Sequence, residues 1–195
     1  MAASFDPARL ARRALLASAL CAPAHFAYAL PARSEARVPT DAEGRAIVKA
    51  KAGRVVAVGG AVTEIVYALG AAATLVAVDT TSQYPPDALK RLPNVGYMRA
   101  LSAEGVLSLR PTLVIAEGDA GPPAVIAQLK AAGVAVVQLR KEPTPAGVVY
   151  KIQAVARLLG RDAEGALLAA AFTADMAALA EAIAKAESKP RVLFV

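Results

Sequence analysis

Residues 54–79 read RVVAVGGAVTEIVYALGAAATLVAVD, and this stretch decides the fold class. It contains two short apolar runs, 55–58 and 75–78, and between them a glycine pair and a segment with helical spacing at 63–69. Neither run alternates with polar residues, which is typical of strands buried on both faces. Two such strands joined by a helix predict the β-α-β unit of a parallel sheet.

The alternation of strand and helix continues further along the chain. We expect a short helix over 102–109, a strand over 113–116, a helix over 123–132 and a strand over 134–139. These strands also lack the polar alternation of a sheet with one face in water. The fold class is therefore predicted as α/β with a parallel sheet, in a unit that covers residues 54–143.

The chain changes character after residue 143. Segments 148–159 and 163–186 contain few helix breakers, so we expect two helices, the second about 36 Å long. A helix that long after a small α/β unit is expected to form a spine between two lobes. Residues 144–188 are therefore interpreted as a helical segment, and 189–195 as the first strand of a truncated second lobe that is otherwise missing.

The N-terminal segment 1–29 has the features of a signal peptide. Three arginines precede a nearly continuous apolar run, and Ala27-Tyr28-Ala29 supplies the small-x-small pattern of a cleavage site. We expect export, cleavage near Ala29 and no stable membrane insertion afterwards. A membrane anchor is the alternative, which would need a longer apolar run, and export by either the Sec or the twin-arginine pathway is open. Residues 30–53 lack apolar periodicity and are expected to form a loosely ordered leader.

Composition excludes several classes of function. The 22 basic and 16 acidic residues give a net charge of +6, scattered without the basic, aromatic-containing stripe of a nucleic-acid-binding protein. The only cysteine, Cys21, and the only histidine, His25, both lie within the predicted signal peptide. A chain without them cannot form a Cys–His nucleophile, a Ser–His–Asp triad or an imidazole-ligated metal site. We therefore expect a protein that is not an enzyme, with metal binding limited to Tyr, Asp, Glu, Met or backbone groups.

Gly59-Gly60 follows the first predicted strand and has two interpretations. A dinucleotide-binding turn would need a third glycine at a fixed offset and a suitably placed acidic residue, and the sequence has neither. A strand-to-helix turn with Thr63 as the N-cap is favoured. Because it lies at the carboxyl edge of a parallel strand, this turn could line a cleft.

The loop after the second predicted strand, Asp79 to Pro86, is polar and ends in Tyr84-Pro85-Pro86. The prolines restrict the backbone and hold the phenol in a fixed direction. A loop tyrosine is commonly a packed or surface side chain. A ligand role is the alternative, which the loss of cysteine and histidine with the signal peptide favours.

Four stretches carry a family resemblance: VGGAVTEIVYALG (58–70), TSQYP (81–85), LPNVGYMRALSAEGVLSLRP (92–111) and GPP (121–123). Together they resemble the periplasmic haem-binding proteins of bacterial ABC importers, within the wider group that captures vitamin B12 and iron siderophores. The resemblance implies two α/β lobes bridged by a long helix, with the ligand held in the cleft between them. It also implies that the parallel-sheet unit is the N-terminal, ligand-binding lobe.

The resemblance further implies roles for individual residues. Tyr84 matches the axial ligand of the ferric iron of haem (heme b), and Gly60 and Gly121 lie in motifs expected to line the haem site. Arg99 is expected to pair with a haem propionate or, alternatively, with an acidic residue of its own lobe. Glu104 matches an acidic residue that docks on the membrane permease; the alternative is a first-turn acid that complements the helix dipole.

Coordination chemistry agrees with the assignment of Tyr84. Ferric iron favours an anionic oxygen ligand, and the charge of the iron must drive deprotonation because free tyrosine has a pKa near 10. Tyr67 and Tyr150 lie inside predicted helices and are expected in the core. Tyr97 is the rival loop tyrosine and is expected to pack over the edge of the lobe.

The expected function is therefore capture of haem in the periplasm and its delivery to an inner-membrane ABC permease with its ATPase, for iron acquisition. A vitamin B12 or ferric-siderophore binding protein is the alternative within the same group. An enzyme on an α/β scaffold is the alternative from another class, and it would need a nucleophile–base pair that the sequence does not provide.

Overall fold

The structure, a computed structural model, describes residues 38–185, 191 and 193. The predicted signal peptide and its cleavage site lie outside the described residues. So does most of the strand predicted at 189–195, of which Arg191 and Leu193 are described and have no regular secondary structure.

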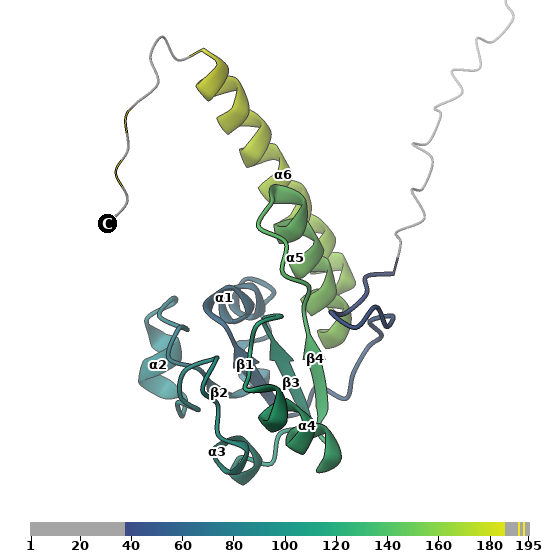
Figure 1. Cartoon of the computed structure of the whole chain (residues 1–195). Helices are drawn as coiled ribbons and strands as arrows, with labels where there is room; N and C mark the ends of the chain where they lie inside the picture. Colours follow the sequence, from purple (N-terminus) through teal and green to yellow (C-terminus); the bar gives the residue numbers. More distant parts are fainter. Residues whose placement is uncertain (1–37, 186–190, 192, 194–195) are drawn as a thin grey trace, which may run out of the picture. The chain divides into compact units, whose positions relative to one another are not determined.

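A four-stranded parallel sheet forms the centre of the fold (Figure 1). Its strands are β1 (Val55–Val58), β2 (Leu75–Val78), β3 (Leu113–Ala116) and β4 (Ala135–Gln138). The spatial order is β2-β1-β3-β4, so the predicted α/β class with a parallel sheet is confirmed. Because the order reverses between β1 and β3, the carboxyl ends of these two strands form the topological switch point, where α/β proteins bind ligands.

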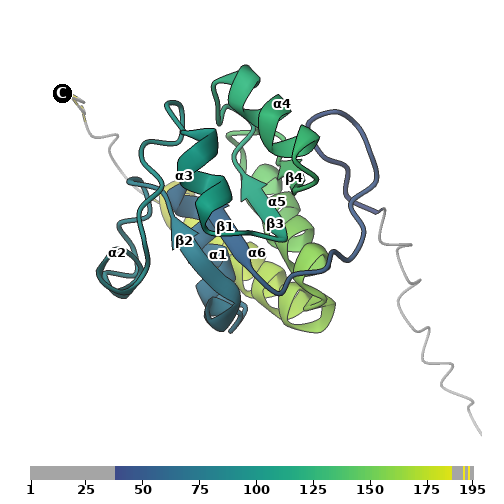
Figure 2. The same ribbon diagram turned by 90° about the horizontal axis from the view of Figure 1, so that it is seen from below.

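Helices cover both faces of the sheet (Figure 2). They are α1 (Gly60–Ala68), the 3-10 helix η2 (Ala72–Thr74), α2 (Asp87–Arg91), α3 (Ala103–Ser108), α4 (Pro123–Ala131), α5 (Pro145–Leu159) and α6 (Asp162–Ala184). One hydrophobic cluster joins the sheet to α1, α5 and the start of α6, and a second joins the opposite face to α3 and α4. All four residues of β1 and of β3 are fully buried, which is why neither strand alternates in sequence.

The first helix corrects one local prediction. Gly59, with φ 117°, is the N-cap of α1, and Thr63 lies in the second turn of the helix rather than at its cap. The Thr63 side chain is fully buried, and its hydroxyl lies 2.7 Å from the Ser82 hydroxyl. The threonine therefore serves a contact with the loop after β2, not the start of the helix.

The described part of the leader, 38–53, differs from the loosely ordered segment expected for it. Ile47 is 3% exposed within the larger hydrophobic cluster, and the Ala50 N–H donates to the Leu158 carbonyl at 3.0 Å. The Asp41 carboxylate accepts hydrogen bonds from the backbone and guanidinium of Arg45. Burial raises the pKa of Asp41, but these hydrogen bonds outweigh it and lower the pKa overall. The buried Ile47 side chain and the turn that Asp41 stabilises thus hold this segment on the fold, although it has no apolar periodicity.

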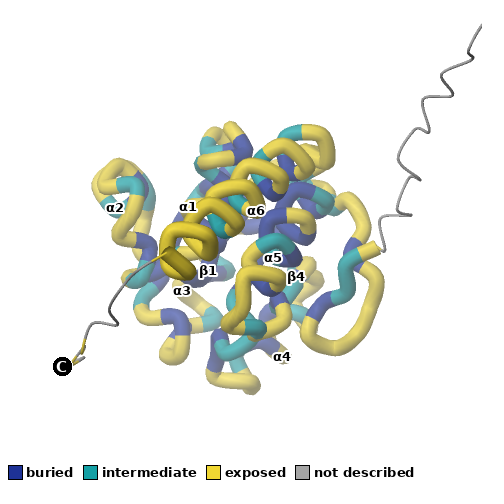
Figure 3. Tube along the Cα trace, turned by 90° about the horizontal axis from the view of Figure 1, so that it is seen from above, coloured by how far each residue is buried: buried dark blue, intermediate teal, exposed yellow. Residues whose placement is uncertain are grey.

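The long helix α6 confirms the predicted spine helix in length and position. Its first turns pack on α5, where a Cβ at Gly165 would collide with the Ala156 side chain. Most of the remaining helix is exposed (Figure 3), and its exposed side chains include Leu179 and Ile183. The most apolar 18 residues of α6 have a mean hydropathy of 1.6, and 6% of them are buried. By length and composition, α6 could therefore span a membrane. Core helices of water-soluble proteins meet the same criteria, so composition alone does not assign α6 to a membrane.

Candidate functional site

The carboxyl ends of the parallel strands bring the predicted motifs to one edge of the sheet. Gly59-Gly60 follows β1, the Tyr84 loop (residues 79–86) follows β2, and the β3 loop (residues 117–122) follows β3. All strands are parallel, so these segments share the edge at which ligand sites of α/β proteins form. This edge is the candidate site.

The Tyr84 loop is fixed by a buried carboxylate. Asp79 is fully buried and accepts four hydrogen bonds: Oδ1 from the Gly59 N–H (2.8 Å) and the Ser82 hydroxyl (2.9 Å), and Oδ2 from the Thr81 N–H (3.1 Å) and hydroxyl (2.8 Å). The Ser82 side chain also contacts the Thr63 hydroxyl. The loop is therefore tied at several points to the first turns of α1.

Gly60 lies directly beneath this loop. Its N–H donates to the Thr81 hydroxyl at 2.9 Å, and a Cβ at Gly60 would come within 2.6 Å of the Thr81 carbonyl oxygen. A side chain here would displace the loop. Gly60 thus contacts the loop that carries Tyr84. The two predicted site residues are connected through Thr81 of this loop.

Tyr84 itself is exposed beyond this hydrogen-bonded base. It is 65% exposed, against 44% for Tyr97, and both stand among the exposed large hydrophobic side chains of the described chain. The other two tyrosines of the described residues meet their predictions: Tyr150 is 7% exposed in the core, and Tyr67 packs partly buried against the same cluster. Tyr84 is therefore the more accessible of the two loop phenols.

Arg99 and Gly121 lie together at a second part of the edge. Both line a hollow of about 520 Å³ that also includes Asp119 and the start of α4. Arg99 bonds the Asp119 carboxylate at 2.7 Å, and Lys141 bonds the same oxygen at 3.1 Å. Hydrogen bonds from Arg99 and Lys141 lower the pKa of Asp119, and its carboxylate in turn raises the pKa of Arg99. Tyr84 and Gly60 do not line this hollow.

Sequence reasoning missed an ion pair at the switch point. The Lys151 ammonium of α5 bonds the Glu117 carboxylate at 2.8 Å, with side chains 17% and 12% exposed. The Glu117 side chain lies over Gly59, because a Cβ there would come within 2.5 Å of its Cγ. An acidic residue directly after the buried β3 run was the available signal, but nothing in the sequence pointed to its partner.

Glu104 lies away from these groups, on the first turn of α3. Ser102 caps this helix by accepting a hydrogen bond from the Gly105 N–H at 3.3 Å, and Glu104 is exposed. Its position fits both interpretations of the sequence, a first-turn acid and an accessible docking residue.

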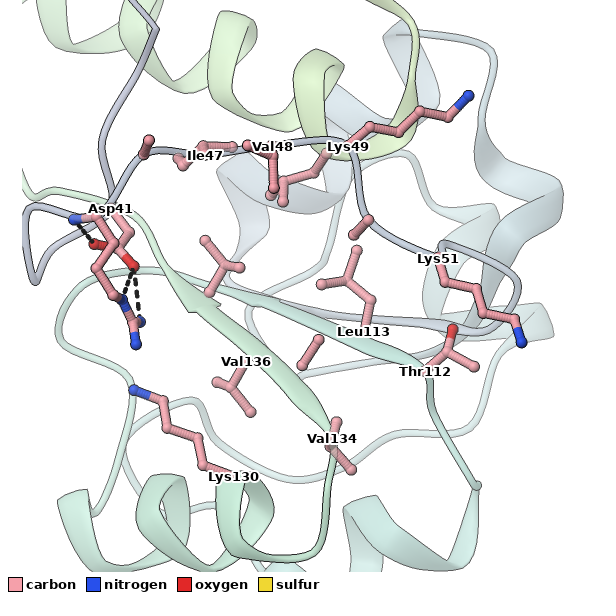
Figure 4. Close-up of a pocket in the computed structure, with 16 residues that line it drawn as sticks. Asp41, Ile47, Val48, Lys49, Lys51, Thr112, Leu113, Lys130, Val134 and Val136 are labelled. Carbon is pink, nitrogen blue, oxygen red and sulfur yellow. Dashed lines mark hydrogen bonds and ion pairs between the residues drawn. The ribbon is translucent and has the colours of Figure 1, made fainter.

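A larger hollow of about 590 Å³ follows the edge strand β4 (Figure 4). It separates segment 45–51 from β4, and its apolar lining includes Ile47, Leu113 and Val136. Lys49 and Lys51 point away from it. No predicted site residue lines this hollow, so it is not part of the candidate site.

Residues 55–195 match the family described as periplasmic binding protein, which is more than half of the chain. The chain belongs to this family. The match confirms the family resemblance, and it agrees with the α/β sheet followed by a long helix. Periplasmic binding proteins are a substrate-binding group rather than enzymes.

Similar structures include the periplasmic heme-binding protein RhuT from Roseiflexus sp. RS-1, with 44% identity and a TM-score of 0.68 over 70% of this chain and 52% of that chain. The periplasmic heme-binding protein BhuT in complex with two hemes has 49% identity and a TM-score of 0.64, over 67% and 50% of the respective chains. The vitamin B12-binding protein of Vibrio cholerae serotype O1 is 39% identical over 80 residues, 41% of this chain and 29% of the relative. The chain thus spans about half the length of the similar structures.

Proposed function

We propose that this periplasmic binding protein captures haem in the periplasm and delivers it to an ABC importer. The observation that carries the proposal is the Tyr84 phenol, 65% exposed at the carboxyl edge of the sheet above a hydrogen-bonded loop. The similarity to RhuT and BhuT, both described as heme-binding, supports haem as the ligand.

Tyr84 supplies the chemistry that ferric haem needs. A phenolate oxygen is a hard anionic donor that suits ferric iron, and the positive charge of the iron favours the deprotonated form of the ligand. The exposed side chain is free to meet the flat face of a porphyrin without disturbing the core. We therefore assign Tyr84 as the axial iron ligand.

Arg99 and Gly121 would receive another part of the ligand. Two cations, Arg99 and Lys141, surround the single carboxylate of Asp119, so this cluster has a net positive charge. Such a charge favours the anionic propionates of haem. Gly121 lines the same hollow and adds no side chain to it.

Glu104 is proposed as a docking residue for the permease. Its exposed carboxylate on α3 lies outside the hollow that Arg99 and Gly121 line, and it is free to pair with cations of a membrane partner. In this proposal haem binding and transport depend on different residues.

A ferric haem titration of the 195-residue chain tests the proposal. We expect the absorption bands of a tyrosinate-bound ferric haem in the unmodified chain, loss of the charge-transfer band and weaker binding in Tyr84→Phe, and neither change in Tyr97→Phe. Glu104→Ala should bind haem normally but reduce import when placed in a transport-competent protein. An unchanged spectrum in Tyr84→Phe, or loss of the band in Tyr97→Phe, would overturn the assignment.

Vitamin B12 is the second candidate ligand, because the Vibrio cholerae vitamin B12-binding protein is 39% identical over 80 residues. A parallel titration with cyanocobalamin separates the two. Saturable binding of cobalamin without binding of haem would replace the proposed ligand.

A further inference from the structure

Asp79 is a buried carboxylate that the proposed ligand contacts do not use. It is fully buried, and no ion pair to it is present among the described residues, yet it accepts four hydrogen bonds. Burying a carboxylate without a cation is costly unless such donors compensate it.

The four donors come from two different parts of the chain. One is the Gly59 N–H at the start of α1, and three belong to Thr81 and Ser82 of the Tyr84 loop. Further contacts run in parallel, from the Gly60 N–H to the Thr81 hydroxyl and between the Ser82 and Thr63 hydroxyls. Asp79 is therefore one of the groups that join the start of α1 to the loop, and it accepts the most hydrogen bonds among them.

Hydrogen bonds to a charged acceptor are about twice as strong as neutral ones, so the carboxylate fixes the loop more firmly than an amide or hydroxyl would. A ligand group that is ordered before binding avoids the loss of conformational entropy on binding. The backbone between Ser82 and Tyr84 is short, with the Gln83 N–H also bonded to the Thr81 carbonyl at 2.8 Å. The hydrogen bonds at Asp79 therefore restrict the backbone at Tyr84, because few rotatable bonds separate the two.

We propose that Asp79 is the positioning residue of Tyr84: its buried carboxylate joins the start of α1 to the Tyr84 loop and sets the direction from which the phenolate meets the iron. This inference rests on the proposed haem-binding function. It assigns to Asp79 an effect on affinity and on the iron spectrum without any contact to the ligand.

Asp79→Asn is the test, because it keeps the shape of the side chain and removes its charge. Each carboxylate oxygen accepts one backbone N–H, from Gly59 or from Thr81, so the amide nitrogen of asparagine must face a donor at one of them. We expect haem affinity to fall about tenfold, which corresponds to about 1.4 kcal/mol, and the tyrosinate charge-transfer band to shift or weaken. Amide hydrogen exchange at residues 80–84 should be faster in the ligand-free protein.

Asp41→Asn is the matched control. Asp41 is 4% exposed and also accepts backbone hydrogen bonds within a turn, but that turn lies in the leader. The Asp41→Asn substitution should lower the stability of the protein without changing the haem spectrum or the amide hydrogen exchange of residues 80–84. If Asp79→Asn and Asp41→Asn have the same haem spectrum and affinity as the unmodified chain, the positioning role is wrong and the proposed function stands.

A second pair of variants decides the question if Asp79→Asn does not fold. Thr81→Val removes the hydroxyl that donates to Asp79, whereas Thr81→Ser keeps it. Only Thr81→Val should weaken the charge-transfer band, and equal spectra for the two would overturn the inference. If the unmodified chain itself shows no tyrosinate band with ferric haem, the proposed function fails first and the inference fails with it.

Discussion

The Tyr84 loop and the β3 loop lie on either side of β1 at the same edge of the sheet, but they are held in different ways. The Tyr84 loop depends on one fully buried carboxylate whose partners are uncharged donors. The β3 loop carries Glu117 and Asp119, each paired with cations, and the Asp119 cluster is largely in solvent. Salt screens the exposed pairs of the Asp119 cluster much more than the buried hydrogen bonds of Asp79.

This difference suits the two halves of the proposed ligand. An iron atom accepts its axial ligand from a narrow range of directions, and a buried hydrogen-bonded base provides that precision. Propionates are flexible and hydrated, and exposed Arg99 and Lys141 side chains can follow them. In the proposed complex, the hydrogen-bonded loop would fix the position of the iron, and the charged cluster would adapt to the propionates.

The largest effect is expected from Gly60→Ala, which perturbs the hydrogen-bonded Tyr84 loop. The new Cβ would lie within 2.6 Å of the Thr81 carbonyl oxygen, so the Tyr84 loop or α1 must move. We expect a loss of about 3 kcal/mol or more in the free energy of unfolding, the upper end for overpacking substitutions, because the atom that is met belongs to the backbone. Haem binding should also weaken. Gly53→Ala is the control, because nothing lies within 4 Å of a Cβ there. Chemical denaturation that shows equal stability for the two variants would contradict the tight contact.

An intermediate effect is expected from Lys151→Met, which leaves Glu117 without its partner. The Glu117 side chain is 12% exposed, so an unpaired charge there is costly, about 1–3 kcal/mol. Lys141→Met removes a cation that is 65% exposed and should cost less than about 1 kcal/mol. Urea unfolding of both variants checks the order, and adding Glu117→Gln to Lys151→Met should recover part of the loss. Equal costs would mean that the two ion pairs are equally solvated.

The smallest effect is expected from Asp119→Asn, and it depends on pH. Hydrogen bonds from Arg99 and Lys141 lower the pKa of Asp119, so its contribution to stability is present above the unfolded-state pKa of about 3.9. It is lost as the pH falls through the lower, folded-state pKa. We expect the variant to lose about 0–1 kcal/mol at pH 7 and to match the unmodified chain in strong acid. Thermal unfolding across this range checks the sign, since a difference that grows on acidification would contradict the lowered pKa.

The fold could be predicted wherever burial leaves a mark in the sequence. The bounds of β1, β2 and β3 agree with the apolar runs, because strands covered on both faces tolerate no polar residue. The helix α2 was missed, since its five residues are too few to show periodicity. Its one buried side chain is Ala88, and an exposed pair between Arg91 and Asp87 lies along it.

The site could be predicted only at the level of its loops. The Tyr84 motif and the strand before it predicted at which edge of the sheet the loop lies, but the partners of its polar residues are distant in sequence. Thr63 and Ser82 are separated by 19 positions, and Glu117 and Lys151 by 34. Spacing along the chain does not encode such pairs, because they depend on how α1 and α5 pack over the sheet.

The close contact at Gly165 affects the direction of the α6 axis. The helix is clamped near its beginning, where Gly165 meets Ala156 and Ala169 is the last buried residue. From Ala169 to Ala184 it continues for about 22 Å. A tilt on the order of 10° at the clamp would therefore swing the far end through about 4 Å, by the geometry of a lever of that length. A methyl group added at Gly165 would thus displace α6 least at the site of the substitution and most at the far end of the helix.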